Sequence, residues 1–492
     1  MSKKNIHIIG AGVAGLSAAG TLAKLGYEVE VFDKNPQVGG RASIWKKDGF
    51  TFDMGPSWYW MPEVFEEYFE SMDSSVAAHY DLIRLDPSYR VFFGEEQIVD
   101  VPASFDELKA LFESFEPGAA RKLQEYMDEA SYKYQVGMNE FVWKPSKSIL
   151  DFMQFKVLRS LLKLDMLTSI SDHVSKYFQD TRIKQIMEFP VLFLGAPPSN
   201  TPALYSLMNY ADLKLGTWYP KKGMHEISKG MHAVAEQYGA KFHLNAPVEE
   251  IQLAGNKTKG IRLQGGATYE SEAMVAAADY HHVDQHLLPK GYQQYSERYW
   301  ESRAMAPSSL LFYLGFDRTL PGLKHHNLFF DESFDLHSDT IYNTGTWPKD
   351  PMFYACVPSK TDPTVAPEGM ENVFLLVPLA PGLKDDAKER DRLFEFMMKK
   401  LNHYTGVDPR PHVKVKRAFA MNEFQSVYNS FKGNAYGLAN TLRQTAFLKP
   451  SMFHKKLKNL FFAGQLTVPG PGLPPSIISG QLAARQVHKK LS

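Results

Sequence analysis

The chain has 492 residues, with 55 Lys and Arg against 55 Asp and Glu, so its formal net charge is zero. This length is enough for two or more domains, and the balanced charge disfavours a nucleic-acid partner, because such proteins usually carry a basic excess. The single cysteine, Cys356, excludes an intrachain disulfide and suits a reducing cytosol. We interpret it as a small buried apolar residue.

The N-terminus contains the first chemical motif. A short apolar run at 6–9 predicts a buried strand, a helix is expected over 16–25, and a second strand over 27–32. Between the first strand and the helix stands GAGVAG, and Asp33 follows the second strand. This order is the fingerprint of a Rossmann-type dinucleotide site, in which the helix N-terminus binds phosphates and the acid binds a ribose diol. The cofactor-binding residues expected here are Gly10, Gly12, Ala14, Gly15, Asp33 and Lys34.

The next stretch distinguishes an FAD site from an NAD site. It runs from Lys34 to Trp58 and reads KNPQVGGRASIWKKDGFTFDMGPSW. Its Gly39-Gly40-Arg41 element resembles the GGR signature of the flavin amine oxidase and carotenoid desaturase superfamily. In that superfamily the glycines let the chain pass close to the cofactor and the arginine faces its diphosphate. The FTFDMGPSW segment resembles a strand and turn near the flavin, to which Gly55, Pro56 and Ser57 belong. We expect Asp53 to brace this turn rather than to act in chemistry.

Further elements of the dinucleotide-binding domain are expected in the middle of the chain. A helix is expected through Ile227 and Met231 to Tyr238, followed by two strands in KFHLNAPVEEIQL. The resemblance places the backbone of Val248 at the adenine edge, although Lys222 replaces the first glycine of the usual pair. A buried strand should end at Ala277-Ala278-Asp279. The neighbouring His281 and His282 would point to opposite sides of an extended segment, so no metal site is expected.

The C-terminal stretch NLFFAGQLTVPGPGLPPSIISGQLAARQV predicts a final strand, a stiff loop and a final helix that begins at Ser476. Proline limits φ and removes N–H donors, and glycine permits close approach, so this loop suits an apolar wall against the flavin ring. The positive end of the helix would face the flavin. The expected cofactor contacts here are Gly464, Gly472, Leu473 and Ile477.

Together these motifs resemble the bacterial-type phytoene desaturases of the carotenoid desaturase family, and the match covers most of the chain. The resemblance implies an α/β fold: a Rossmann-type FAD-binding domain like that of glutathione reductase, with an inserted α+β substrate domain. We expect residues 1–75, 220–285 and 450–492 to bind FAD, and residues 76–219 and 286–449 to bind substrate. The implied substrate is a long polyene hydrocarbon, phytoene, converted stepwise to lycopene, neurosporene or zeta-carotene.

A water-insoluble substrate implies contact with a membrane surface. Within the segment from Lys144 to Ile170, apolar residues such as Leu150, Val157 and Leu164 fall on one helical face. This helix, near 145–170, either docks on a membrane or packs on its own domain. With no signal peptide or transmembrane helix predicted, we expect a cytoplasmic protein attached peripherally to the inner membrane.

The expected chemistry is removal of a hydride to the flavin and of a proton from the neighbouring carbon. No catalytic base is identified, although Asp172, His173 and Glu188 flank the apolar FPVLFLG run. Electrons would pass on to a quinone or to dioxygen. The alternatives are another desaturase, an isomerase or a saturase of the family, a flavin amine oxidase, a protoporphyrinogen oxidase, or a non-catalytic lipid-binding escort protein.

Overall fold

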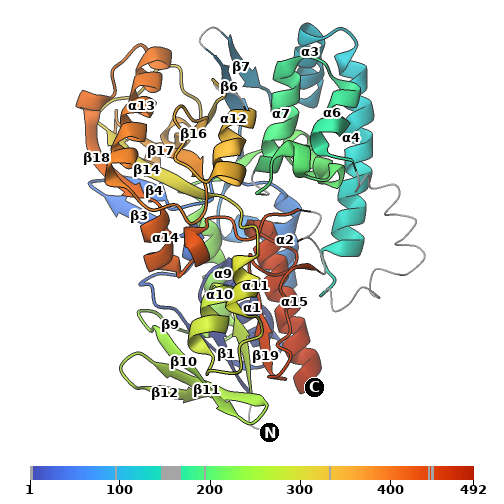
Figure 1. The fold of residues 1–492 in the computed structure, drawn as a ribbon, viewed down its shortest axis with the longest axis vertical. Helices are drawn as coiled ribbons and strands as arrows, with labels where there is room; N and C mark the ends of the chain where they lie inside the picture. The colour runs from blue at the N-terminus through green and yellow to red at the C-terminus, as the bar shows by residue number, and fades with distance from the viewer. Residues whose placement is uncertain are drawn as a thin grey trace.

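The computed structural model describes residues 4–94, 97–145, 168–192, 195–331, 334–441, 444 and 448–492. Two sheets organise these residues, one near the chain termini and one at the opposite end of the molecule (Figure 1). The segment proposed for membrane docking lies almost entirely outside the described residues. Among the described residues, no helix combines the length and apolar character needed to cross a membrane.

A five-stranded parallel sheet forms the part near the termini, in the order β19-β13-β1-β2-β9. Its strands are β1 (Asn5–Ile9), β2 (Glu28–Phe32), β9 (Lys241–His243), β13 (Ala273–Ala276) and β19 (Leu460–Phe462). β13 and β19 are wholly apolar and buried, as strands of a parallel sheet covered on both faces commonly are. Three segments far apart in the sequence therefore build one sheet.

Two helices from opposite ends of the chain lie side by side on this sheet, α1 (Val13–Lys24) and α15 (Leu473–Leu491) (Figure 1). They meet at Gly480, where an added Cβ would fall 2.3 Å from the carbonyl oxygen of Ala14. Ser17 Oγ also donates a hydrogen bond of 2.7 Å to the carbonyl oxygen of Ile477. This contact sets the start of α15 beside the glycine-rich turn.

The second sheet is mixed and has seven strands, in the order β18-β14-β17-β16-β15-β6-β7. Its strands are β6 (Tyr89–Phe93), β7 (Gln97–Val101), β14 (Ser308–Phe316), β15 (His326–Phe329), β16 (Phe353–Cys356), β17 (Glu371–Leu379) and β18 (Val413–Phe419). Every residue of β14 is buried. One face packs on Leu393, Met397 and Leu401 of α13 (Ala387–Thr405).

Further strands and helices lie in the part of the chain that the structure describes. The remaining strands are β3 (Ile44–Lys47), β4 (Phe50–Asp53), β5 (Leu82–Arg84), β8 (Trp218–Pro220), β10 (Val248–Ala254), β11 (Lys257–Leu263) and β12 (Thr268–Glu270). The remaining helices are α2 (Pro62–Ser71), α3 (Phe105–Phe115), α4 (Ala119–Val136), α6 (Ile170–Tyr177), α7 (Thr181–Leu192), α8 (Leu207–Tyr210), α9 (His225–Gln237), α10 (Tyr280–His282), α11 (Glu297–Glu301), α12 (Phe334–Asp339) and α14 (Met421–Tyr428).

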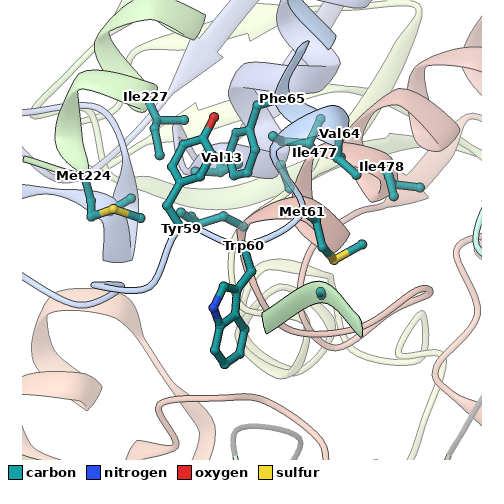
Figure 2. Close-up of a cluster of buried hydrophobic side chains, with 14 of the residues drawn as sticks. Val13, Tyr59, Trp60, Met61, Val64, Phe65, Met224, Ile227, Ile477 and Ile478 are labelled. Carbon is teal, nitrogen blue, oxygen red and sulfur yellow. The ribbon is translucent and has the colours of Figure 1, made fainter. Parts of the chain in front are cut away.

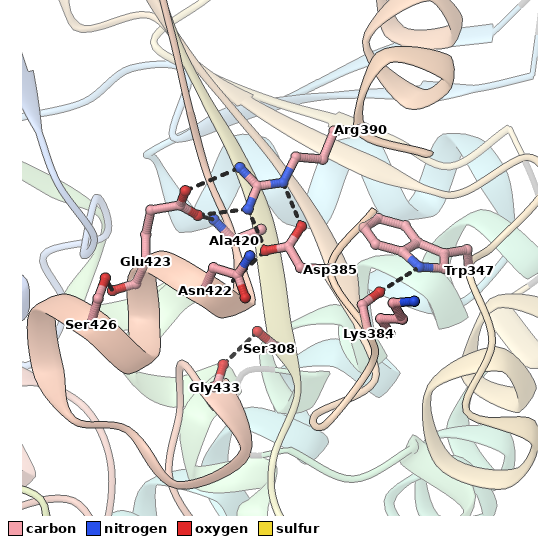
Figure 3. A network of polar contacts seen from close by, with 10 residues as sticks. All are labelled: Ser308, Trp347, Lys384, Asp385, Arg390, Ala420, Asn422, Glu423, Ser426 and Gly433. Atoms are coloured by element: carbon pink, nitrogen blue, oxygen red, sulfur yellow. Dashed lines mark hydrogen bonds and ion pairs between the residues drawn. The ribbon is translucent and has the colours of Figure 1, made fainter. Parts of the chain in front are cut away.

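A polar network holds α14 against the start of α13 (Figure 3). The Arg390 guanidinium donates to both the Asp385 and the Glu423 carboxylates, and its contact with Glu423 measures 2.7 Å. Glu423 Oε2 also accepts from the backbone N–H of Ala420 at 2.7 Å and so caps α14. The network matters for function because α14 borders the cavity described below.

Two local expectations are wrong. His281 and His282 lie in the short helix α10 rather than on an extended segment, because the Asp279 side chain caps that helix. The final helix begins at Leu473 rather than Ser476, since prolines fit the first turn of a helix, where no intrahelical N–H partner is needed. Apart from such boundaries, the α/β fold with a Rossmann-type sheet is confirmed. The domain limits given above stay a proposal.

Candidate active site

A cavity of about 690 Å³ lies at the carboxyl ends of the parallel strands and reaches the seven-stranded sheet. The turns after β1, β2, β13 and β19 line one part of it, and residues of β14, β16 and β17 line another. Ligands of open parallel sheets bind at this edge. The two sheets therefore enclose a common site.

Two stretches of backbone come close together where the glycine-rich turn at 10–15 meets the Gly39-Gly40-Arg41 element. Gly10 has a φ of +103°, a value that favours glycine. An added Cβ on Gly40 would lie 3.1 Å from the Cα of Gly12, and one on Gly15 would lie 1.9 Å from the carbonyl oxygen of Gly10. Gly15 thus lets α1 pack on β1, while Gly12 and Gly40 leave backbone bare at the cavity wall.

Asp33 lines the cavity at the end of β2 and braces the same turn. Its carboxylate accepts hydrogen bonds from the backbone N–H groups of Ala11, at 2.7 Å, and Asn35, at 2.8 Å. Burial raises the pKa of Asp33 above its ordinary value. Next to it, Lys34 Nζ donates to Asn429 Oδ1 at 2.7 Å, which ties the site to the end of α14.

Arg41 is a half-buried cation on the cavity wall. Its guanidinium donates to Ser430 Oγ and to the carbonyl oxygen of Asn434, while Nε has no hydrogen-bond partner. Burial lowers the pKa of Arg41, and the Asp279 carboxylate opposes that effect. Burial also raises the pKa of Asp279 to about 6, and its Oδ2 atom is likewise unpartnered. Orphaned buried polar atoms on the wall of a cavity indicate groups that await a ligand.

The part of the cavity next to the seven-stranded sheet is mainly apolar and aromatic. Its lining includes Trp58, Trp60, Met208, Leu311, Tyr354, Phe374, Leu376 and Tyr436. Trp60 and Met61 extend from a buried cluster that also holds Tyr59, Phe65 and Ile227 (Figure 2). A hydrophobic core thus supports this wall, which suits a ligand recognised by shape and apolar contact.

The proline-glycine loop closes the cavity from the C-terminal side, with Pro471, Gly472, Leu473 and Pro474 on its wall. Gly472 has a φ of +110° and precedes the first turn of α15. Pro474 and Pro475 carry no N–H and the Ser476 N–H bonds to Gly472, so the first turn offers the Leu473 N–H and the positive end of the helix dipole to the cavity.

The structure brings most of the expected site residues to this one cavity. Its lining includes Gly10, Gly12, Ala14, Asp33, Lys34, Gly40, Arg41, Gly55, Pro56, Ser57, Val248, Gly464, Gly472 and Leu473. Gly15 and Ile477 lie behind the wall, in the helix contacts described above. Sequence reasoning missed Tyr354, Phe424 and Tyr436 on the wall, because no local motif marks them. It also missed His282, which lines the cavity from α10.

The three acid–base candidates lie elsewhere. Asp172 is held by Ser169 at the start of α6, and His173 packs against Tyr126 with Glu129 at 3.6 Å. Glu188 belongs to α7. None of the three is among the described lining residues.

A different set of metal-ligating residue types comes together on β15 and β16. One ligand atom each from His325, His326 and Cys356 lies within 4.8 Å of the others, and all three residues are buried. His326 and Cys356 are opposite each other in the antiparallel register. Burial raises the pKa of the Cys356 thiol to about 12. Strand pairing brings together residues 30 positions apart, so no local sequence pattern predicts this cluster.

The cavity fits FAD. Bare glycine backbone and an incompletely satisfied arginine suit a diphosphate, Asp33 is placed for a ribose, and the apolar loop at 471–474 suits a flat ring. The residues that would hold FAD are those expected from the sequence, with Gly15 and Ile477 acting only through packing. Bound FAD supplies a two-electron acceptor.

Comparison with known proteins shows the family. Residues 13–488 match the family of flavin-containing amine oxidoreductases. A carotenoid 3,4-desaturase of Haloarcula japonica is 39% identical over 493 residues, covering 100% of this chain and 99% of the relative. A zeta-carotene-forming phytoene desaturase of Myxococcus xanthus is 32% identical over 494 residues, covering 98% of this chain and 94% of the relative.

Solved structures support the fold. An oxidoreductase from Methanosarcina mazei has a TM-score of 0.64 at 15% identity, covering 97% of this chain and 98% of that one. A putrescine oxidase has a TM-score of 0.62 at 14% identity, covering 99% of both chains. At such low identity these matches show the fold alone. The chain belongs to the flavin-containing amine oxidoreductases and, within them, to the carotenoid desaturases, FAD-dependent oxidoreductases that act on CH–CH groups.

Proposed function

We propose that this desaturase oxidises phytoene stepwise toward zeta-carotene, neurosporene or lycopene. The observation that carries the proposal is the continuity of the cavity from its glycine and arginine end to its aromatic end. A hydrocarbon chain offers no hydrogen bonds, so an apolar wall beside the flavin position is the chemistry that would recognise it. The Myxococcus relative, named for forming zeta-carotene from phytoene, supports the same substrate.

The protein's own contribution to the reaction is orientation and exclusion of water. Trp58, Trp60 and Tyr354 would hold the chain-like substrate against one face of the cavity, and the loop at 471–474 would limit its movement. Fixing both reactants in a dry slot lowers the entropy cost of the reaction. Allylic carbons stabilise developing positive charge themselves, so few polar groups are required along the slot.

Expression in two bacterial hosts tests the substrate assignment, one accumulating phytoene and the other accumulating lycopene. The proposal predicts that phytoene is consumed in the first host and that polyenes with more conjugated double bonds appear. Conversion of lycopene without any conversion of phytoene would instead favour a later carotenoid desaturase, an alternative supported by the 39% identity to a carotenoid 3,4-desaturase.

Two further parts of the proposal concern location and electron flow. We propose that the enzyme works on the cytoplasmic face of a membrane, because its substrate is insoluble in water, and that a quinone or dioxygen reoxidises its flavin. Flotation of the purified protein with lipid vesicles tests the first part. The rate of flavin reoxidation by a quinone analogue, compared with that by dioxygen, tests the second.

A further inference from the structure

Ser57 is a polar residue that borders two cavities at once, a position it shares with the apolar Phe374. It lines the large cavity, and it also lines a separate small cavity of about 10 Å³ behind the wall. That volume is about the size needed for one water molecule. Ser57 therefore lies between the proposed substrate slot and a small, mainly apolar chamber into which a few polar groups reach.

The small cavity has a carboxylate on its wall. Asp53 lines it together with His325, Cys356, Tyr219 and Asn372. The two oxygens of Asp53 accept hydrogen bonds from the backbone N–H groups of Met224, at 2.9 Å, and His225, at 3.1 Å. These bonds tie the end of β4 to the start of α9 rather than to the turn at 54–57. Burial nevertheless raises the pKa of Asp53 to about 7, so that this carboxylate has a proton affinity suited to a base near neutral pH.

A second polar chain reaches Ser57 from β15 and β16. Tyr354 Oη donates a hydrogen bond to Ser57 Oγ at 3.0 Å, and His326 Nδ1 lies 2.6 Å from Tyr354 Oη. His326 is fully buried and stacks on Trp58, with ring centroids 4.0 Å apart. Burial lowers the pKa of His326 well below its ordinary value, so the ring stays neutral. With its proton on Nδ1, His326 supports Tyr354 as a donor to Ser57.

We propose that Ser57 Oγ accepts the proton released by desaturation and that Asp53, reached through one water molecule in the small cavity, is the final proton acceptor. Tyr354 and His326 serve as positioning residues that fix the orientation of the Ser57 hydroxyl. This inference rests on the proposed function, and it supplies the base that the sequence left unidentified.

Each electron pair and each proton in this step has a defined acceptor. Bound FAD would supply the oxidant, taking up hydrogen with its electron pair from one allylic carbon. The neighbouring C–H bond then breaks, its electrons form the new double bond, and its proton passes to Ser57 Oγ. The original hydroxyl proton of Ser57 moves through the water to the Asp53 carboxylate. Because a carbon next to a polyene cation is strongly acidic, a serine backed by a weak base is sufficient.

The test uses full-length enzyme with bound FAD and phytoene in lipid vesicles, without oxygen, and measures the product of a single turnover. Asp53→Asn should slow formation of the new double bond by about tenfold or more. Asp362→Asn is the matched control. Asp362 is also buried and accepts from the backbone N–H of Lys222 in the same turn, at 2.6 Å, but it borders neither cavity. It should retain the wild-type rate.

Substitution of Ser57 provides a second test, with a smaller change to the side chain than Asp53→Asn. Ser57→Ala should slow the reaction as Asp53→Asn does, and Ser57→Thr, which keeps a hydroxyl, should restore most of the rate. Phytoene deuterated at the carbon that loses the proton adds a readout that a merely structural role would not alter. An isotope effect should appear in Asp53→Asn, Ser57→Ala and Tyr354→Phe that is absent from the wild type, because proton removal becomes limiting.

The outcomes separate the two proposals. A wild-type enzyme that leaves phytoene unchanged contradicts the proposed function itself. Wild-type turnover together with normal rates in both Asp53→Asn and Ser57→Ala overturns the proton path, as does equal slowing by Asp362→Asn without any isotope effect. Loss of wild-type turnover on treatment with a chelator would also overturn it, because His325, His326 and Cys356 would then hold a metal at the small cavity.

Discussion

An added Cβ on Gly40 would lie 3.1 Å from the Cα of Gly12, although the two residues belong to different turns at the carboxyl edge of the parallel sheet. A side chain on Gly40 would require the turn at Gly12 to shift, whereas one on Gly12 would meet the Cα of Gly40 at an ordinary contact distance of 4.0 Å. The bare backbone between them forms the part of the cavity that we assign to the FAD diphosphate.

Gly40→Ala should therefore weaken FAD binding by about tenfold or more, the effect of losing about 1.4 kcal/mol. Gly345→Ala is the control, since its φ of +61° matches the +57° of Gly40 and its added Cβ meets no atom within 4 Å. Both variants should lose about 1 kcal/mol of stability from the left-handed backbone. Titration of the apoproteins with FAD measures the difference, and equal affinities would contradict the assignment.

Arg41→Met should raise the FAD dissociation constant about 10- to 100-fold, because charge-assisted hydrogen bonds contribute about 1.5–3 kcal/mol. Arg41→Lys should recover only part of the affinity, since a point charge cannot replace a planar fork on two phosphate oxygens. Equilibrium dialysis with FAD checks both variants. Wild-type affinity in Arg41→Met would show that the arginine is only a structural partner of Ser430 and Asp279.

Asp212 predicts a pH dependence of stability. Burial raises the pKa of Asp212 from 3.8 to about 7, although its carboxylate accepts from Tyr89 Oη at 3.0 Å and Thr217 Oγ1 at 3.1 Å. The folded state thus binds a proton more tightly than the unfolded state. The tighter proton binding by Asp212 therefore stabilises the folded state fully below about pH 4, and this stabilisation is lost as the pH rises toward 7.

Asp212→Asn should reduce the fall in the free energy of unfolding between pH 4 and 7. The slope should change by at most about 1.4 kcal/mol for each pH unit in that range. Urea titrations of the apoprotein between pH 4 and 8 measure the slope, with the exposed Asp128→Asn as control. A slope equal to that of the wild type would show that Asp212 is already ionised at low pH in the folded protein.

Arg390→Met should lower the free energy of unfolding by about 3 kcal/mol, because it leaves two partly buried carboxylates without a partner. Arg410→Met, which removes an exposed arginine paired with Asp408, should cost about 1 kcal/mol or less. Thermal or chemical unfolding of the two variants gives the comparison. Similar losses in both would mean that the network in Figure 3 contributes little to holding α14.

The Rossmann part was predictable because its signals are local. The turn at Gly10, the close approach at Gly12 and the acid at position 33 each follow from backbone geometry within about 30 residues. The start of α15 lies three residues before the predicted Ser476, because Pro474 and Pro475 fit a first helical turn as well as a loop.

The substrate side was not predictable in the same way. Ser57, Tyr354 and His326 meet only because β15 and β16 pair in one register and because β16 comes to lie beside the turn after β4. No local pattern carries that information. The sequence instead drew attention to His281 and His282, which share a short helix, and gave no sign of His325, His326 and Cys356.

The most direct test of the central claim is an anaerobic single turnover of the purified enzyme with bound FAD and phytoene in vesicles. The account predicts that the visible absorbance of the flavin bleaches and that one new double bond forms for each flavin reduced. A flavin that remains oxidised in the presence of phytoene and of the later polyenes, or that bleaches with a simple amine instead, would contradict it.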